Sequence, residues 1–105
     1  MDRSNIIKLI SETRTQDSIG QWVSQEIERT VFCDVRSITR DEWFNAGQDG
    51  LQPSFMFVIF EPDYQGEKIV EFNGHRYGVY RTFRARNERM ELYVEEKGGL
   101  NGGQN

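Results

Sequence analysis

Alternation of apolar and polar positions is clearest near the C-terminal end of the chain. Between 88 and 97, Met90, Leu92 and Val94 alternate with charged or amphipathic residues. A period of two places successive side chains on opposite faces of a strand. We therefore predict a strand over 88–97 whose three apolar residues face a core. The apolar run over 54–60 predicts a second strand that is buried on both faces.

The pair Asn73–Gly74 separates two strand-like runs, 68–72 and 75–84. Asn-Gly is the strongest short-range hairpin signal, because both central positions of a type I′ turn need positive φ. The segment 84–88 predicts a further turn. We expect the strands 68–72, 75–84 and 88–97 to follow one another as a meander.

The N-terminal half is less decisive. The segment 30–38 alternates, with Val31, Cys33 and Val35 on one face, and predicts a strand. The segments 5–14 and 19–28 fit helical as well as extended spacing. We favour strands, for the β-branched content of 5–14 and the extended neighbours of 19–28. A turn cluster at 15–18 separates them.

A short helix is predicted at residues 40–46. Thr39 and Glu42 match a capping box, and Gly47 suits a left-handed C-terminal stop. Two turns of helix are marginal without packing, so Trp43 and Phe44 need a surface to contact. The helix either closes one end of its own barrel or gains its order against another subunit.

These elements predict an all-β fold: a small β-barrel of about six strands with one short helix inserted at residues 40–46. At 105 residues, a single domain is expected over 1–97, followed by a flexible glycine-rich tail over 98–105. The lone Cys33 favours a reducing compartment. No targeting segment is expected at the start of the chain, and the longest apolar run is too short to cross a bilayer.

Candidate chemistry is sparse. His75 directly follows the Asn-Gly turn without an evident partner, and Cys33 lies in an apolar strand pattern that predicts a buried, inert thiol. Glu61 and Asp63 flank Pro62 but lack the spacing of a calcium loop, and no zinc or phosphate-binding motif is present. We expect no enzyme activity, no metal and no cofactor.

The net charge of −4 is unevenly distributed. Residues 41–71 hold seven acids and one base, while residues 72–105 hold six bases and four acids. Basic residues are interleaved with Phe83 in the stretch RTFRARNER, namely Arg81, Arg84, Arg86 and Arg89. This cluster suits either a single-stranded nucleic acid or, more in keeping with the charge asymmetry, an acidic protein surface.

Three stretches that follow one another over 6–97 carry a resemblance: VFCDVRSITRDEWFNAGQDGLQPSFMFVIF, then DYQGEKIVEFNGHRYGVYRTFR, then MELYVEEK. In order and spacing they resemble the head–tail adaptor, or head-closure, family of tailed double-stranded DNA phages and prophages. The resemblance implies a small β-barrel subunit that joins a ring beneath the portal, closes the DNA exit channel and gives the tail a docking surface.

Carried onto this chain, the resemblance implies an assembly loop within 41–52 that lines or plugs the channel. Its candidate residues are Asp41, Glu42, Trp43, Phe44, Gln48, Asp49 and Leu51. Acids in such a lining repel DNA phosphates. The four arginines would form the partner interface. The implied partners are copies of the chain itself, phage adaptor or portal proteins, tail proteins and passing double-stranded DNA read without sequence specificity. The implied location is the virion connector, reached from the host cytoplasm during assembly, without membrane contact. The alternative is a single-stranded nucleic-acid-binding barrel that uses the Arg81–Arg89 hairpin.

Overall fold

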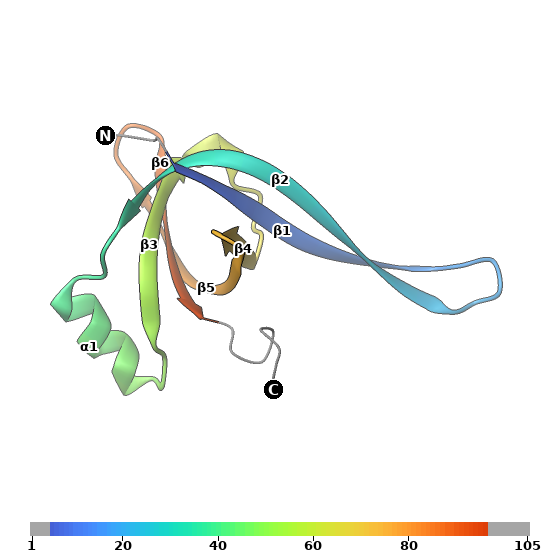
Figure 1. Ribbon diagram of the computed structural model, residues 1–105, viewed down its shortest axis with the longest axis horizontal. Coiled ribbons are helices and arrows are strands. Elements are labelled where there is room, and N and C mark those ends of the chain that lie inside the picture. Colours follow the sequence, from blue (N-terminus) through green and yellow to red (C-terminus); the bar gives the residue numbers. More distant parts are fainter. Residues whose placement is uncertain (1–4, 97–105) are drawn as a thin grey trace.

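Six antiparallel strands form one closed sheet, with a single α-helix beside it, in a computed structural model that describes residues 5–96 (Figure 1). The elements are β1 (Asn5–Gln16), β2 (Trp22–Arg36), α1 (Arg40–Gln48), β3 (Pro53–Phe60), the 3-10 turn η1 (Glu61–Asp63), β4 (Ile69–Phe72), β5 (His75–Ala85) and β6 (Arg89–Glu96). The all-β prediction with one short helix is confirmed. The tail predicted over 98–105 lies outside the described residues.

The strand order around the barrel is β1-β2-β3-β6-β5-β4. Four of the neighbouring pairs are consecutive in sequence, and β3 pairs with β6 along almost its whole length. Pairing of β1 with β4 closes the ring through only three register pairs: Lys8–Glu71, Leu9–Val70 and Ile10–Ile69. Within residues 5–96, no helix combines the length and apolar character that a membrane span requires.

The barrel interior is filled by side chains from every strand. Phe57 lies at its centre, fully buried, with its ring near those of Phe55, Phe72 and Tyr77. The predicted inward positions of the last strand are confirmed, since Met90, Leu92 and Val94 are all buried. The core residues that surround them are Ile7, Leu9, Val31, Cys33, Ile59 and Val70.

Both predicted turns of the C-terminal meander are present. Asn73 and Gly74 have φ values of 53° and 81°, as a type I′ hairpin requires. The next turn contains Asn87 and Glu88 with φ values of 59° and 57°. The left-handed region is uncommon for a non-glycine residue such as Glu88. The backbone carbonyl of Glu88 accepts a hydrogen bond from the Glu61 amide at 2.6 Å.

The separate strands predicted over 19–28 and 30–38 are wrong: the structure has one continuous strand, β2. Its register with β1 is unbroken from Gln16–Trp22 to Asn5–Cys33, so pairing leaves no room for a break at residue 29. The turn also lies later than predicted. The Asp17 carboxylate accepts hydrogen bonds from the amides of Ile19 and Gln21, which fixes the tip of this hairpin.

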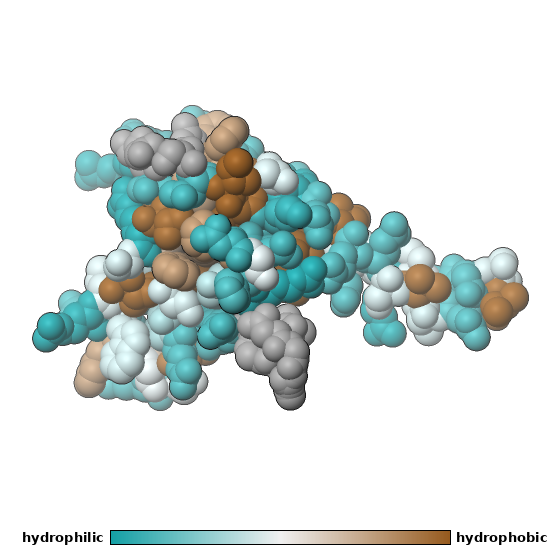
Figure 2. Space-filling view, in the orientation of Figure 1, coloured by the Kyte–Doolittle hydropathy of each residue, from teal (hydrophilic) through white to brown (hydrophobic). Residues whose placement is uncertain are grey.

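The outer half of the β1–β2 hairpin, residues 11–27, extends well beyond the barrel as a two-stranded ribbon that we call the arm (Figure 1). It accounts for the elongated shape of the molecule, whose principal extents are 50 × 31 × 22 Å. Nearly all of its residues are exposed, including Ile19 at 75% and Trp22 at 63%. Figure 2 shows hydrophobic side chains among polar ones out to the far end of the arm.

Replacement of the central core ring tests this packing. We expect Phe57→Ala to lower the free energy of unfolding by about 3–5 kcal/mol, because it leaves a cavity among aromatic rings. Phe83→Ala, which truncates a ring that is 51% exposed, should change it by less than about 1 kcal/mol. Urea unfolding of the two variants checks this. Similar losses in both would contradict a core centred on Phe57.

Candidate assembly surfaces on the helix and the arm

Helix α1 begins as the sequence predicted. Thr39 is the N-cap, and its side-chain oxygen accepts a hydrogen bond from the Glu42 amide at 3.1 Å. The second half of the predicted capping box is replaced by another contact. The Glu42 carboxylate turns toward the barrel, where it accepts hydrogen bonds from the Tyr80 hydroxyl at 2.7 Å and from Arg81 Nη2 at 2.5 Å.

The helix ends later than predicted. Gly47 lies inside α1, which runs to Gln48, and Gly50, with φ of 80°, takes the left-handed position. The Gly50 amide donates to the Gly47 carbonyl and the Leu51 amide to the Ala46 carbonyl. These two bonds form a Schellman motif, which satisfies carbonyls that the helix end would leave unpaired.

A β-bulge in β5 explains how two neighbouring side chains reach Glu42. The register of β5 with β6 shifts between Val79 and Arg81, so Tyr80 is an extra residue on its strand. Without a bulge, Tyr80 and Arg81 would point to opposite faces of the sheet. The bulge instead allows both to point outward to the helix, a re-aiming that such irregularities commonly provide.

The contact between α1 and the barrel is strongly polar. Burial alone raises the pKa of the Glu42 carboxyl, but the hydrogen bonds from Arg81 and Tyr80 outweigh it and hold that pKa below its ordinary value. Burial and the bond to Glu42 raise the pKa of the Tyr80 hydroxyl. The Arg81 guanidinium also lies 3.9 Å from the Tyr93 ring centre, in a cation–π contact. Glu42 is therefore an anchor for the helix.

The opposite side of α1 faces solvent. Trp43 and Phe44 are 58% and 61% exposed, whereas Ala46 is buried against the barrel. Between helix and barrel lies an open pocket of about 410 Å³, which includes the predicted loop residues Asp49 and Leu51. Asp41 and Gln48 are exposed. The predicted loop residues are thus divided between an anchored side and an aromatic outer side of the same helix.

The four predicted interface arginines do not form one surface. Arg81 is bound to Glu42, on the side of the barrel that carries α1. Arg84 pairs at 3.5 Å with Glu61, and Arg89 donates to the Arg86 carbonyl at the β5–β6 turn. Phe83 remains half exposed beside them. The basic cluster is therefore divided: Arg81 contacts α1, whereas Arg86 and Arg89 lie at the β5–β6 turn.

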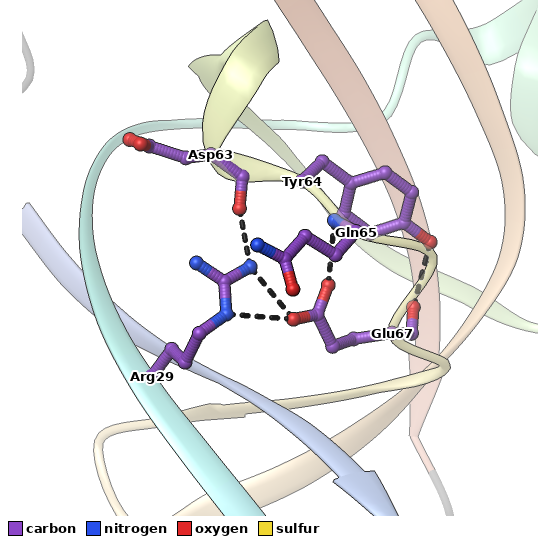
Figure 3. Close-up of polar contacts among 5 residues, drawn as sticks. All are labelled: Arg29, Asp63, Tyr64, Gln65 and Glu67. Carbon is purple, nitrogen blue, oxygen red and sulfur yellow. Dashed lines mark hydrogen bonds and ion pairs between the residues drawn. The ribbon is translucent and has the colours of Figure 1, made fainter.

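At the base of the arm, a buried carboxylate joins the loop after η1 to β2 (Figure 3). Glu67 is only 5% exposed, and its carboxylate accepts hydrogen bonds from Arg29 at 3.0 and 2.7 Å and from the Gln65 amide at 2.9 Å. Arg29 also donates to the Asp63 carbonyl, and the Tyr64 hydroxyl to the Glu67 carbonyl at 2.6 Å. Burial raises the pKa of the Glu67 carboxyl, but the hydrogen bonds from Arg29 and from the Gln65 amide outweigh it and hold that pKa below its ordinary value.

A second arginine braces the arm from another strand. Arg76 of β5 forms a two-point contact with Glu26 of the arm, at 2.7 and 2.9 Å, and lies 3.5 Å from Glu71. The hydrogen bond from Arg76 holds the pKa of Glu26 below its ordinary value. Arg29 thus ties β2 to the loop after η1, and Arg76 ties the arm to β5.

The arm and its two braces are the features that sequence reasoning missed. Glu67 follows a turn and reads as a solvated acid, and Arg29 and Arg76 lie among other charged residues. The sequence pattern that could have indicated the arm is a set of large apolar residues interleaved with polar ones, namely Ile19, Trp22, Val23 and Ile27. That pattern also suits an ordinary strand, so it could not reveal a ribbon free of the barrel.

The reactive residues lie apart from these surfaces. Cys33 is fully buried, as predicted, and burial together with Asp34 raises the pKa of its thiol to about 12. His75 is exposed at the start of β5. Among residues 5–96, no group of three or more histidine, cysteine or acidic side chains is placed to hold a metal ion. In comparisons with known proteins, no protein-family model matches the chain and no curated protein matches its sequence.

The helix anchor has a pH-dependent signature. We expect Glu42→Gln to lower the free energy of unfolding by about 1–2 kcal/mol at pH 7, because charge-assisted hydrogen bonds are lost. Since the pKa of Glu42 is lowered on folding, its contribution is present above the ordinary value of 4.5 and is lost as the pH falls below it. The difference from wild type should therefore narrow in acid. Urea unfolding of the variant and the wild type at pH 7 and at a pH below 4.5 measures this difference. Glu12→Gln on the arm is the control. A pH-independent difference would contradict the anchor.

The two arm braces differ in the burial of their carboxylates, and this predicts unequal costs. Arg29→Met should lower the free energy of unfolding by about 2–3 kcal/mol, because the Glu67 carboxylate loses its charged partner where water cannot replace it. Arg76→Met should cost less, since the Glu26 side chain is 39% exposed and regains water. Urea unfolding compares the matched variants. Equal losses would show that burial of Glu67 is unimportant.

Proposed function

We propose that the protein is a structural subunit of a phage or prophage connector. In this role it forms a ring between portal or adaptor and tail, closes the DNA exit channel and presents a docking surface to the tail. The observation that carries the proposal is the placement of its apolar side chains. The barrel core is complete, yet Ile19 and Trp22 on the arm and Trp43 and Phe44 on the helix stay exposed.

Apolar side chains that project on two appendages favour an assembly role over a catalytic one. Exposed aromatic groups are typical of protein interfaces, where they supply contact area at a small entropic cost. Both appendages are also held in place before any partner arrives, one by Glu42 and the other by Glu67 and Glu26. Such preorganisation reduces the entropy lost on association. The resemblance of the sequence to head-closure proteins adds the viral setting.

The acidic lining of the channel is proposed for fewer residues than the sequence suggested. The Glu42 carboxylate is neutralised by Arg81, so its substitution would loosen the helix and obscure any effect on DNA. Asp41 and Asp49 remain exposed. At 100° per residue, neither lies in the centre of the side of α1 that carries Trp43 and Phe44. They can therefore face passing DNA in a ring whose subunits bury those aromatics.

Complementation of defective particles tests the proposal. DNA-filled capsids assembled without this protein should lose their DNA and fail to join tails, and addition of the purified chain should restore both. The double variant Trp22→Ser, Ile19→Ser should restore them several-fold less well, because the arm loses its apolar contact area. Gln16→Ser, a polar change on the same arm, is the control. Stable DNA retention and tail joining without the protein would refute the connector role.

A second measurement separates the connector from the nucleic-acid alternative. The chain should show no salt-dependent binding of single-stranded oligonucleotides at physiological ionic strength. Binding that weakens steeply with salt and is lost in Arg84→Ala, Arg86→Ala would favour the alternative instead. For the channel assignment, Asp41→Asn, Asp49→Asn should slow DNA ejection from restored particles, because phosphate repulsion is reduced. Unchanged ejection would remove that assignment while leaving the connector role intact.

A further inference from the structure

The tip of the β4–β5 hairpin is a chemically reactive dipeptide that is open to solvent. Asn73 and Gly74 are exposed, and a Cβ placed on Gly74 would meet no atom within 4 Å. Within residues 5–96, neither the Asn73 side chain nor the Gly74 backbone amide is held by a hydrogen bond. Asparagine is one of the labile residues of proteins. A following glycine increases this lability, because no side chain shields its backbone nitrogen from the asparagine carboxamide.

We propose that Asn73 is a site of spontaneous deamidation in the folded protein. The Gly74 backbone nitrogen loses its proton to solvent and bonds to the side-chain carbonyl carbon of Asn73, which closes a five-membered succinimide ring. The side-chain nitrogen takes up a proton and leaves as ammonia. Water then adds to one of the two ring carbonyls and breaks its bond to the ring nitrogen. The product is aspartate, or isoaspartate in which the main chain runs through the former side chain, and water is the only other reactant.

The turn can reach the conformation that ring closure requires. Asn73 and Gly74 have φ values of 53° and 81°, the two positive values of a type I′ turn. A type II′ turn keeps the positive φ at the first central residue, sets its ψ to about −120° and has a negative φ at the second. At that ψ the next backbone nitrogen is eclipsed with Cβ and lies against the side-chain carboxamide. Glycine adopts either sign of φ without a steric penalty, so the central peptide group can rotate from one turn type to the other.

The strands on either side of the turn do not have to separate for this rotation. Types I′ and II′ both close two-residue hairpins, so the flanking pair Phe72–His75 is compatible with either. Other asparagines lack this combination of features. Asn45 and Asn87 are followed by residues that carry side chains, and Asn45 also lies inside α1, where helical hydrogen bonds fix the backbone. The β4–β5 tip therefore combines the reactive sequence with a backbone that allows the reaction without unfolding.

The isoaspartate product weakens the place where the barrel closes. It inserts an extra carbon atom into the main chain of a two-residue loop, and the length and type of such a loop fix the register of the strands that it joins. Strand β4 has only four residues and closes the ring through three register pairs with β1. Few pairs are thus present to hold β4 in place when its turn no longer fits. The aspartate product keeps the normal main chain and adds only a negative charge.

Peptide mass spectrometry of the full chain, stored at neutral pH, tests the site. Trypsin releases Asn73 in the peptide 69–76 and releases Asn45 and Asn87 in other peptides. Asn73 should gain the mass that replacement of NH2 by OH adds, several-fold faster than Asn45 or Asn87. Folding should slow it less than about tenfold relative to the chain in guanidinium chloride, because a tenfold slowing equals a barrier increase of about 1.4 kcal/mol. Stronger slowing, or a rate no higher than that of Asn87, would overturn the proposal.

Urea unfolding of the separated products tests the effect on barrel closure. The isoaspartate form, purified from the aged chain by ion exchange, should unfold at a lower urea concentration than Asn73→Asp. This variant is the matched control, since it carries the same charge on a normal main chain. Asn73→Asp should differ little from wild type, because Asp-Gly also suits a type I′ turn. Equal unfolding midpoints for the isoaspartate form and Asn73→Asp would overturn the link between the tip and closure, whatever the rate of deamidation.

Discussion

Closure of the barrel depends on a short stretch of pairing between β1 and β4. Lys8, Leu9 and Ile10 are the only described β1 residues that pair with β4, and Leu9 is fully buried beside Val70. Inward of this point β1 belongs to the barrel, and outward of it the same strand becomes one half of the arm. The three pairs therefore decide both how the core is sealed and how much of the hairpin is left free.

The free part of the hairpin is stiffened by charge rather than by packing. Arg29 reaches the buried Glu67 just where β1 leaves β4, and Arg76 holds Glu26 one step farther along the arm. A buried carboxylate is costly unless several donors surround it, and Glu67 has Arg29 and the Gln65 amide. The loop that follows η1 is thereby tied to the arm. An appendage held in this way loses little conformational entropy when it binds.

Helix α1, on the other side of the barrel, is also held by contacts to a carboxylate, that of Glu42. One extra residue in β5 turns Tyr80 and Arg81 outward together, and both bind a single carboxylate on α1. This orientation fixes which side of the helix faces water, and that side carries Trp43 and Phe44. The molecule thus combines a buried barrel core with two anchored elements, α1 and the arm, whose apolar side chains its own fold leaves exposed.

Local patterns in the sequence were sufficient for the elements whose structure depends on neighbouring residues. Alternation predicted β6 and its inward residues, Asn73–Gly74 predicted the hairpin, and Thr39 predicted the helix start, because each depends on a few adjacent side chains. The class of fold followed from the number and spacing of these strands. The register of β1 with β2 could not be predicted from these local patterns. For that reason the strand break predicted between residues 28 and 30 was wrong.

The tertiary structure decided the features that depend on residues far apart in the chain. Glu42 was expected to cap its own helix, but a bulge 38 residues later offered it two donors. Glu67 was hidden from sequence reasoning because its partner Arg29 also lies 38 residues away. The arm is free because β4 is short and pairs with only three residues of β1. The exposure of Trp22 and Trp43 likewise depends on where the barrel ends. The sequence could not predict it, because an aromatic residue in an amphipathic strand or helix gives the same pattern whether or not a neighbouring layer covers it.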